Sequence, residues 1–77
     1  MNARKAAIKA AKAHKVNVKD ERYWIKIAIR MAVDRGKGCT IKDIFYIENL
    51  DWLKKNGFKY HPYYGDFYYI ISWSDKE

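Results

Sequence analysis

Residues 53–60 read Leu-Lys-Lys-Asn-Gly-Phe-Lys-Tyr, and this stretch marks the point where a helix ends and a strand begins. Gly57 can take the left-handed backbone conformation that ends many helices, because it has no Cβ to clash. In that arrangement Phe58 folds back onto Leu53 in the last turn of the helix. The sequence therefore predicts a helix over 46–56 that is followed directly by a strand.

The aromatic segment 58–73 predicts a β-hairpin that turns around 62–66. Alternation along the first strand turns Phe58 and Tyr60 inward. On the second strand it gives one core face, which contains Phe67, Tyr69, Ile71 and Trp73.

Upstream of this unit, Asp20 is a good N-cap for a helix that reaches residue 35, where Gly36 and Gly38 end it. Apolar residues at helical spacing predict its core face, which comprises Trp24, Ile27, Ala28, Met31 and Ala32, with Tyr23 and Ile25 widening the stripe. The β-branched segment 39–45 that follows predicts a short strand.

The first 15 residues differ from the rest in composition, because they hold six Ala, many Lys and no aromatic residue. Ala and Lys are strong helix formers, so we expect a helix over 3–15. We predict a basic helical arm at 1–15 and one compact domain at 16–77. The fold class is then α+β, with two N-terminal helices, a short strand, a third helix and a C-terminal hairpin in a small antiparallel sheet. One core is expected to hold Trp24, Ile27, Met31, Leu50, Leu53, Phe58, Tyr69, Ile71 and Trp73.

This order of elements resembles that of winged-helix domains, in which the helix before the hairpin enters the DNA major groove and the hairpin forms the wing. The chain departs from that family because only one helix fits between Gly38 and Gly57. The stretch 50–60, with the closing segment 68–73 that ends in Ile-Ser-Trp, is similar to small phage proteins of uncharacterised activity. That resemblance implies a phage or mobile-element origin, in which small proteins usually act by binding.

Length and charge limit the class of protein. The chain of 77 residues fits one domain, and its net charge is +7, of which +5 lies in the first 20 residues. Its single Cys cannot form an intramolecular disulfide. The longest apolar run, 67–71, is far shorter than the roughly 20 residues that span a bilayer. We therefore expect no membrane partner and a cytoplasmic location, in the host cell if the protein is phage-encoded.

Positive residues of the arm and of the next helix are the leading candidates for nucleic-acid binding, since cations that neutralise phosphates release counterions. A solvated face of a soluble helix is the alternative interpretation. The candidate contacts are Arg4, Lys5, Lys9, Lys12, Arg22, Lys26 and Arg30.

Tyr63, Tyr64 and Tyr68 are expected at the hairpin tip or on its outer face, where aromatic rings stack on bases or anchor a protein interface. Aromatic pairs that merely stabilise the hairpin are the alternative. The leading function is thus a small, basic, non-enzymatic protein that binds nucleic acid through phosphates. The competing hypothesis is an inhibitor or modulator of an acidic host protein, with the hairpin as its anchor.

Catalysis has little support in the sequence. Cys39 with His14 or His61 offers a nucleophile and a base, but nothing places these residues together. A lone Cys at a strand start is typically a small buried hydrophobe, and two His 47 residues apart make no metal signature. We expect no enzyme, no metal and no cofactor, and the oligomeric state is left open.

Overall fold

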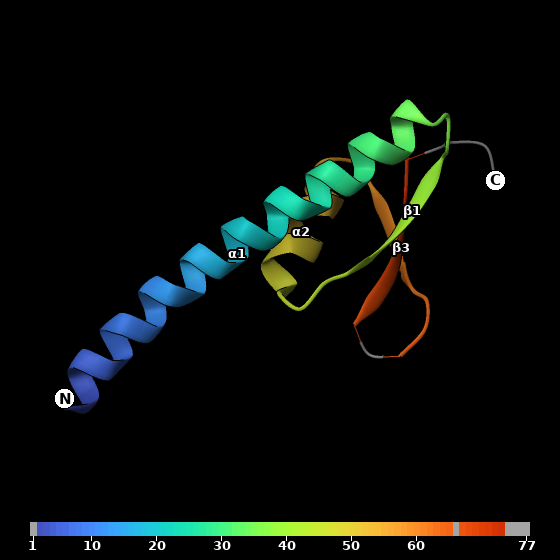
Figure 1. The fold of residues 1–77 in the computed structure, drawn as a ribbon. Helices are drawn as coiled ribbons and strands as arrows, with labels where there is room; N and C mark the ends of the chain where they lie inside the picture. The colour runs from blue at the N-terminus through green and yellow to red at the C-terminus, as the bar shows by residue number, and fades with distance from the viewer. Residues whose placement is uncertain (1, 66, 74–77) are drawn as a thin grey trace.

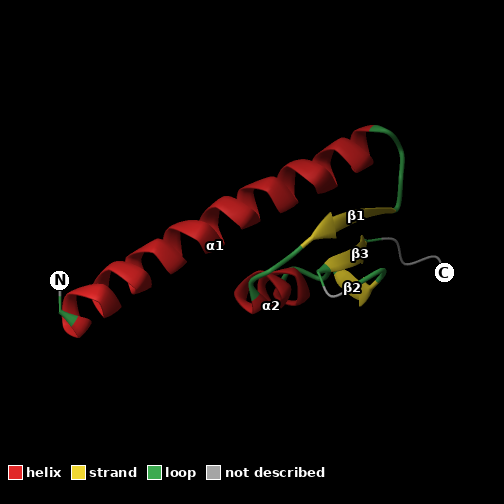
Figure 2. Ribbon diagram, turned by 60° about the horizontal axis from the view of Figure 1, so that its bottom comes forward, coloured by secondary structure: helices red, strands yellow, loops and turns green. Residues whose placement is uncertain are grey.

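A computed structural model describes residues 2–65 and 67–73. Its elements in chain order are α1 (Ala3–Asp34), β1 (Cys39–Asp43), α2 (Ile47–Lys55), β2 (Lys59–Pro62) and β3 (Tyr68–Ser72). The strands form one antiparallel sheet, in which β3 lies between β1 and β2. Figures 1 and 2 show α1 as one long rod, with α2 and the sheet on the same side of its C-terminal half. The α+β class, the small antiparallel sheet, the short first strand and the C-terminal hairpin are confirmed; residue 66 of the expected turn lies outside the described residues.

The prediction of three helices is wrong, because the two expected N-terminal helices are a single helix of 32 residues. Asp20 lies inside this helix instead of capping a new one. Asn2 is the N-cap, and its side chain accepts a hydrogen bond from the Lys5 backbone N–H at 2.9 Å. The connecting residues 16–19 include neither Gly nor Pro, so nothing in them stops helix propagation.

The buried face of α1 also differs from the predicted one. The residues that it buries are Val18, Ile25, Ile29 and Ala32. Trp24 and Met31, which were expected in the core, are 56% and 51% exposed. The helix has two apolar stripes at helical spacing, and the prediction chose the one with the larger side chains. The sheet packs on the other stripe, and of the predicted face Ile25 and Ala32 are confirmed as buried. The chain returns to this end of α1 after the helix, where the Lys37 N–H donates to the Ala32 carbonyl at 2.9 Å.

Leu53 and Ile71 lie at the centre of the core and are fully buried. They pack with Ile25, Ile29 and Ile44, and the residues that surround this cluster are Leu50, Trp52, Phe58, Tyr69 and Trp73. Most of the predicted C-terminal core is therefore confirmed.

Phe67 and Tyr60 are exceptions to the predicted hairpin face, because their side chains are 50% and 36% exposed. Phe67 precedes β3 and packs on Phe45 with ring centroids 4.7 Å apart. Tyr60 is on the edge strand β2 and packs on Tyr69. Both aromatic residues lie at the margins of the sheet, where the helices do not cover them.

The predicted end of α2 at Gly57 is confirmed. Gly57 has a φ of 83°, and the Phe58 N–H donates to the Leu53 carbonyl at 3.0 Å. The Gly57 N–H donates to the Lys54 carbonyl at 3.2 Å, which completes a Schellman motif. This turn directs the chain from α2 straight into β2.

A buried polar residue, Asn49, joins α2 to α1. Its amide nitrogen donates to the Val18 carbonyl at 3.0 Å and to the Glu21 carboxylate at 2.9 Å, and its oxygen accepts from Arg22 Nε at 2.9 Å. Glu21 also accepts from the backbone N–H groups of Phe45 and Tyr46, which lead into α2. The start of α2 is therefore fixed against one turn of α1, and the sequence analysis did not identify this contact.

Ile25→Ala tests the assignment of the buried face of α1. We expect it to lower the free energy of unfolding by about 2–5 kcal/mol, because it opens a cavity beside Leu53 and Ile71. Ile8→Ala on the same helix is the matched control, because Ile8 is 50% exposed and its loss should change stability by less than about 0.5 kcal/mol. Urea denaturation followed by circular dichroism measures both, and equal effects would contradict this packing.

Asn49→Asp tests the junction between the helices with almost no change in side-chain volume. The new carboxylate would lack the two N–H donors and would face Glu21, so we expect a loss of about 3 kcal/mol or more. Asn2→Asp is the same chemical change at an exposed N-cap, where Asp serves as well as Asn, and should stay within about 0.5 kcal/mol. Thermal melts that show similar stability for both variants would rule out a structural role for the Asn49 amide.

Candidate nucleic-acid interface

The unbroken course of α1 brings cations from both halves of the helix onto one face. Residues three or four positions apart lie on the same side of a helix, and these cations follow that spacing without interruption. We call them the cation stripe: Lys12, Lys15, Lys19, Arg22, Lys26 and Arg30. All are exposed except Arg22, which is half-buried. With a rise of 1.5 Å per residue, the stripe is about 27 Å long.

The structure divides the predicted binding residues into two groups. Lys12, Arg22, Lys26 and Arg30 belong to the cation stripe, and Arg4 continues its line toward the N-terminus. Lys5 and Lys9 lie beside this line, on the next face of the helix. The site prediction missed Lys15 and Lys19, which join the two halves of the stripe. Continuing the helical period through 16–19 would have identified them.

The ring of Trp52 on α2 supports the middle of the cation stripe. Arg22 Cζ lies 5.5 Å and Lys26 Nζ 5.4 Å from the ring centroid, within the range of cation–π attraction. Arg22 is also held by Asn49. Two of the six cations are therefore ordered by the protein itself, which reduces the side-chain entropy lost on binding an anion.

A hollow of about 350 Å³ lies beside the middle of the stripe, where α1 meets the start of α2. Lys15, Lys19 and Arg22 line it together with His14 and Glu48. The His14 ring is hydrogen-bonded to Glu48, and this bond holds the pKa of that carboxyl below its ordinary value. Because the pKa is lowered on folding, the contribution to stability is present above the ordinary pKa of Glu and is lost as the pH falls through the lowered value.

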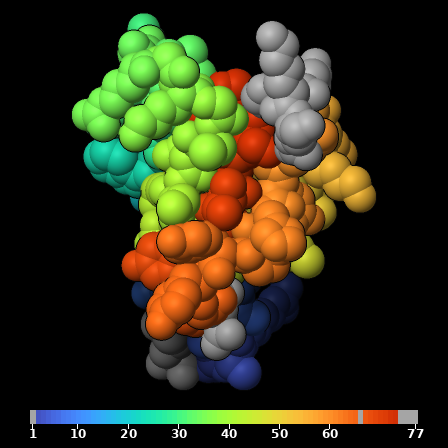
Figure 3. Space-filling model, turned by 90° about the vertical axis from the view of Figure 1, so that its right-hand side faces the viewer, coloured from blue at the N-terminus to red at the C-terminus, as the bar shows by residue number. Residues whose placement is uncertain are grey.

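The hairpin tyrosines are exposed but do not join the cation stripe. Tyr63, Tyr64 and Tyr68 are 56%, 78% and 50% exposed. The loop between β2 and β3 lies at the end of the sheet and away from α1, as Figures 1 and 2 show. Figure 3 shows that this loop protrudes from the face of the molecule on which the sheet is exposed. The exposed pair of Phe45 and Phe67 adds to the aromatic surface of the chain.

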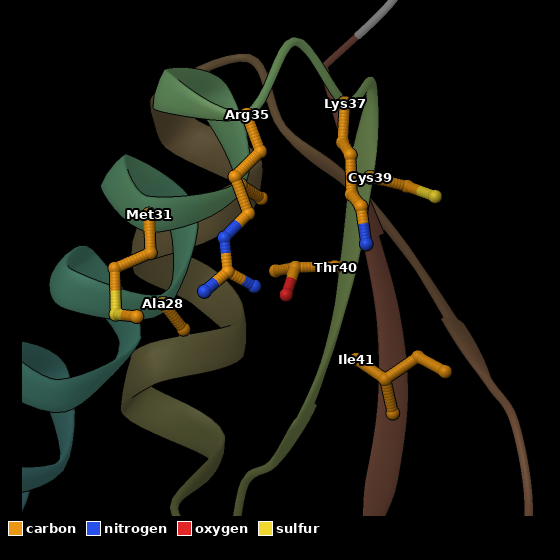
Figure 4. A pocket seen from close by; sticks show the side chains of 8 residues that line it. Ala28, Met31, Arg35, Lys37, Cys39, Thr40 and Ile41 are labelled. Atoms are coloured by element: carbon orange, nitrogen blue, oxygen red, sulfur yellow. The ribbon is translucent and has the colours of Figure 1, made fainter.

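Cys39 is exposed, contrary to the expectation that it is buried. Alternation along the edge strand β1 puts Thr40, paired with the buried Ile71, on the core side and leaves Cys39 on the outer side. Figure 4 shows its sulfur pointing away from α1, at a hollow of about 430 Å³ between α1 and β1. Among the described residues, no three His, Cys, Asp or Glu side chains gather in a way that suits a metal ion.

Comparison of the chain with protein-family models, with curated proteins and with solved structures finds no match. The resemblance to winged-helix domains and to small phage proteins therefore stays a prediction. Within residues 2–65 and 67–73, no helix combines the length and the apolar character needed to cross a membrane.

Proposed function

We propose that this protein binds nucleic acid through its phosphates, using the cation stripe of α1. The supporting observation is the continuous alignment of the six cations along one rigid helix. The helix carries nine cations and three acids, so it holds +6 of the +7 net charge of the chain. Two of the three acids, Asp20 and Glu21, fall outside the stripe positions, and the third, Asp34, lies one turn beyond Arg30 at the C-terminal end of the stripe.

The arrangement suits binding that depends on charge more than on sequence. A stripe of about 27 Å matches about eight base pairs of a duplex, in which successive pairs are 3.4 Å apart. Lys and Arg on this stripe neutralise phosphates and release counterions, which gives affinity for any sequence. The hollow at Lys15 and Lys19 gives two of these cations a recessed place to contact the same phosphate group.

Salt dependence measures the number of phosphates that the stripe contacts. With about five contacts, the logarithm of the association constant should fall with the logarithm of salt concentration with a slope of about −4.5 on duplex DNA. Lys15→Ala/Lys19→Ala should make the slope shallower by about 2, because two contacts are lost. Fluorescence anisotropy on a mixed-sequence duplex of 16 base pairs, and on an RNA strand of equal length, gives these slopes.

Lys9→Ala/Lys37→Ala is the matched control, because it removes the same charge from positions outside the stripe. Its slope should stay within about 1 of the wild-type slope. Equal losses in the two double variants would show that net charge alone, and not the stripe, attracts the nucleic acid. Tight binding that is insensitive to salt would contradict the proposal entirely.

A second candidate function, binding to an acidic protein, is favoured by the exposed aromatic groups. Tyr63 and Tyr64 have ring centroids 6.4 Å apart at the end of the hairpin, and Phe45 packs on Phe67. Rigid exposed aromatic side chains are typical anchors of protein interfaces. Under this hypothesis the cation stripe attracts the partner and the hairpin holds it.

Affinity capture from a cell lysate, with and without nuclease, distinguishes the two functions. Nucleic-acid binding predicts that captured proteins disappear after nuclease treatment and that Tyr63→Ala/Tyr64→Ala changes little. Protein binding predicts one protein that resists nuclease and is lost from the tyrosine variant, because hot-spot aromatics typically contribute about 2 kcal/mol or more. If the Lys15→Ala/Lys19→Ala variant still captured proteins that nuclease treatment removes, that result would contradict the cation stripe as the nucleic-acid site, and it would also contradict protein binding as the function.

A further inference from the structure

A second face of α1 is mainly apolar, and its residues are exposed except for Ile27, which is half-buried. Its residues alternate in steps of four and three, which is the spacing of a coiled-coil seam. We call this face the apolar seam: Ala6, Ala10, Ala13, Asn17, Asp20, Trp24, Ile27 and Met31. Small residues occupy its N-terminal half and large ones its C-terminal half. At about 100° per residue, the seam lies roughly 130° around the helix from the cation stripe.

We propose that the apolar seam is the interface of a homodimer, in which the α1 helices of two copies pack antiparallel. In one register every small residue of the seam meets a large one of the second copy. Ala13 then faces Trp24, and by the same step Ala10 faces Ile27 and Ala6 faces Met31. Alternation of large and small side chains across an interface lets two helices approach closely and fill the space between them.

The same register pairs the two polar residues of the seam with each other. Asn17 of each copy faces Asp20 of the other, on both sides of the two-fold axis, so an amide N–H can donate to a carboxylate at the centre of the interface. A shift by one heptad would set Asn17 against Ile27, or Asp20 against Ala10, and would leave a polar group facing an apolar one. A parallel dimer would set Asp20 against Asp20, two like charges.

The charge at the N-terminal end of α1 also favours an antiparallel second copy. The first turn of the helix contains no acidic residue, so no side chain of that turn compensates the positive end of the helix dipole, whereas Arg35 is the C-cap at the other end. The antiparallel register brings Asp34 of the second copy next to the first turn.

The exposed alanines on the N-terminal part of α1 leave a long helical surface that a second α1 helix can cover. Residues 3–13 are all exposed, and His14, which contacts Glu48 and Tyr46, is the first residue of α1 with a side-chain contact to the rest of the described domain. Two helices of about 12 Å diameter in contact over about 40 Å bury roughly 1,000 Å² in total, at the lower limit of specific interfaces. The dimer should therefore dissociate at micromolar concentrations.

Sedimentation velocity from 1 to 500 µM tests the dimer without nucleic acid. Ala10→Glu should raise the dissociation constant more than about tenfold, because it puts a charge opposite Ile27 of the second copy. Ile8→Glu adds the same charge two residues away, outside the seam, and should change it less than about threefold. Both positions are exposed in the monomer, so circular dichroism should show that both variants fold.

Disulfide trapping tests the direction of packing. In a Cys39→Ser background, chains carrying Ala10→Cys are mixed with chains carrying Ile27→Cys and oxidised. Antiparallel packing predicts mixed disulfides between the two variants, whereas parallel packing predicts disulfides within each variant. Predominant self-pairing of either variant would overturn the register.

The dependence on salt concentration distinguishes dimerisation from nucleic-acid binding, which is the proposed function. Dimerisation should strengthen as salt is added, because two chains of charge +7 repel each other and salt screens that repulsion. Nucleic-acid binding should weaken under the same change. A monomer at all concentrations, or a dimer that Ala10→Glu leaves unchanged, overturns the proposal and assigns the seam to another partner.

Discussion

The position of every surface in this protein depends on the hydrogen bonds of Asn49. The side chain of this residue is fully buried, so its amide must be satisfied by protein groups, and α1 provides them all within one turn, Val18 to Arg22. An apolar contact tolerates rotation and sliding of one helix on another, whereas three directional bonds allow one placement. Since Glu21 of the same turn also binds the backbone before α2, the sheet and α2 are oriented on α1 together.

That placement divides α1 into three faces of different composition and exposure. One face buries Ile25 and Ile29 against the domain. The face next to α2 carries the cation stripe, where Trp52 lies under Arg22 and Lys26. The third face, next to β1, is the apolar seam, with Met31 at the edge of the hollow that Ile41 also lines. Had Asn49 bonded one helical position further along, these faces would be rotated and the stripe and the seam would not be exposed in the same way.

The sequence predicted those elements that depend on local signals. Gly57 and Phe58 identified the end of α2, and alternation of side chains identified β3 and its buried Ile71. It did not predict which stripe of α1 is buried, because Trp24 and Ile25 are both apolar and the choice depends on contacts with distant residues. The burial of Asn49 was not predicted for the same reason, since a polar residue in a short helix shows no local sign that distant residues will bury it. The predicted break between two helices at 16–19 is wrong, because Asp20, although a good N-cap residue, can equally well lie within a helix when no residue stops helix propagation.

Association through the apolar seam and nucleic-acid binding through the cation stripe have opposite requirements, because the positive charge that attracts nucleic acid also repels a second copy of the chain. A rod with +6 charge repels its copies, so dimerisation has to come from contacts that exclude cations, and the alanines of the N-terminal half provide such a surface. In an antiparallel pair the flank of the seam that carries Lys9 faces the same flank of the second copy, and the cation stripe lies further around each helix in the same direction. Both stripes then fall on one side of the pair. Phosphates bound there would neutralise the repulsion between the two helices, so binding of nucleic acid and association of the chains would reinforce each other.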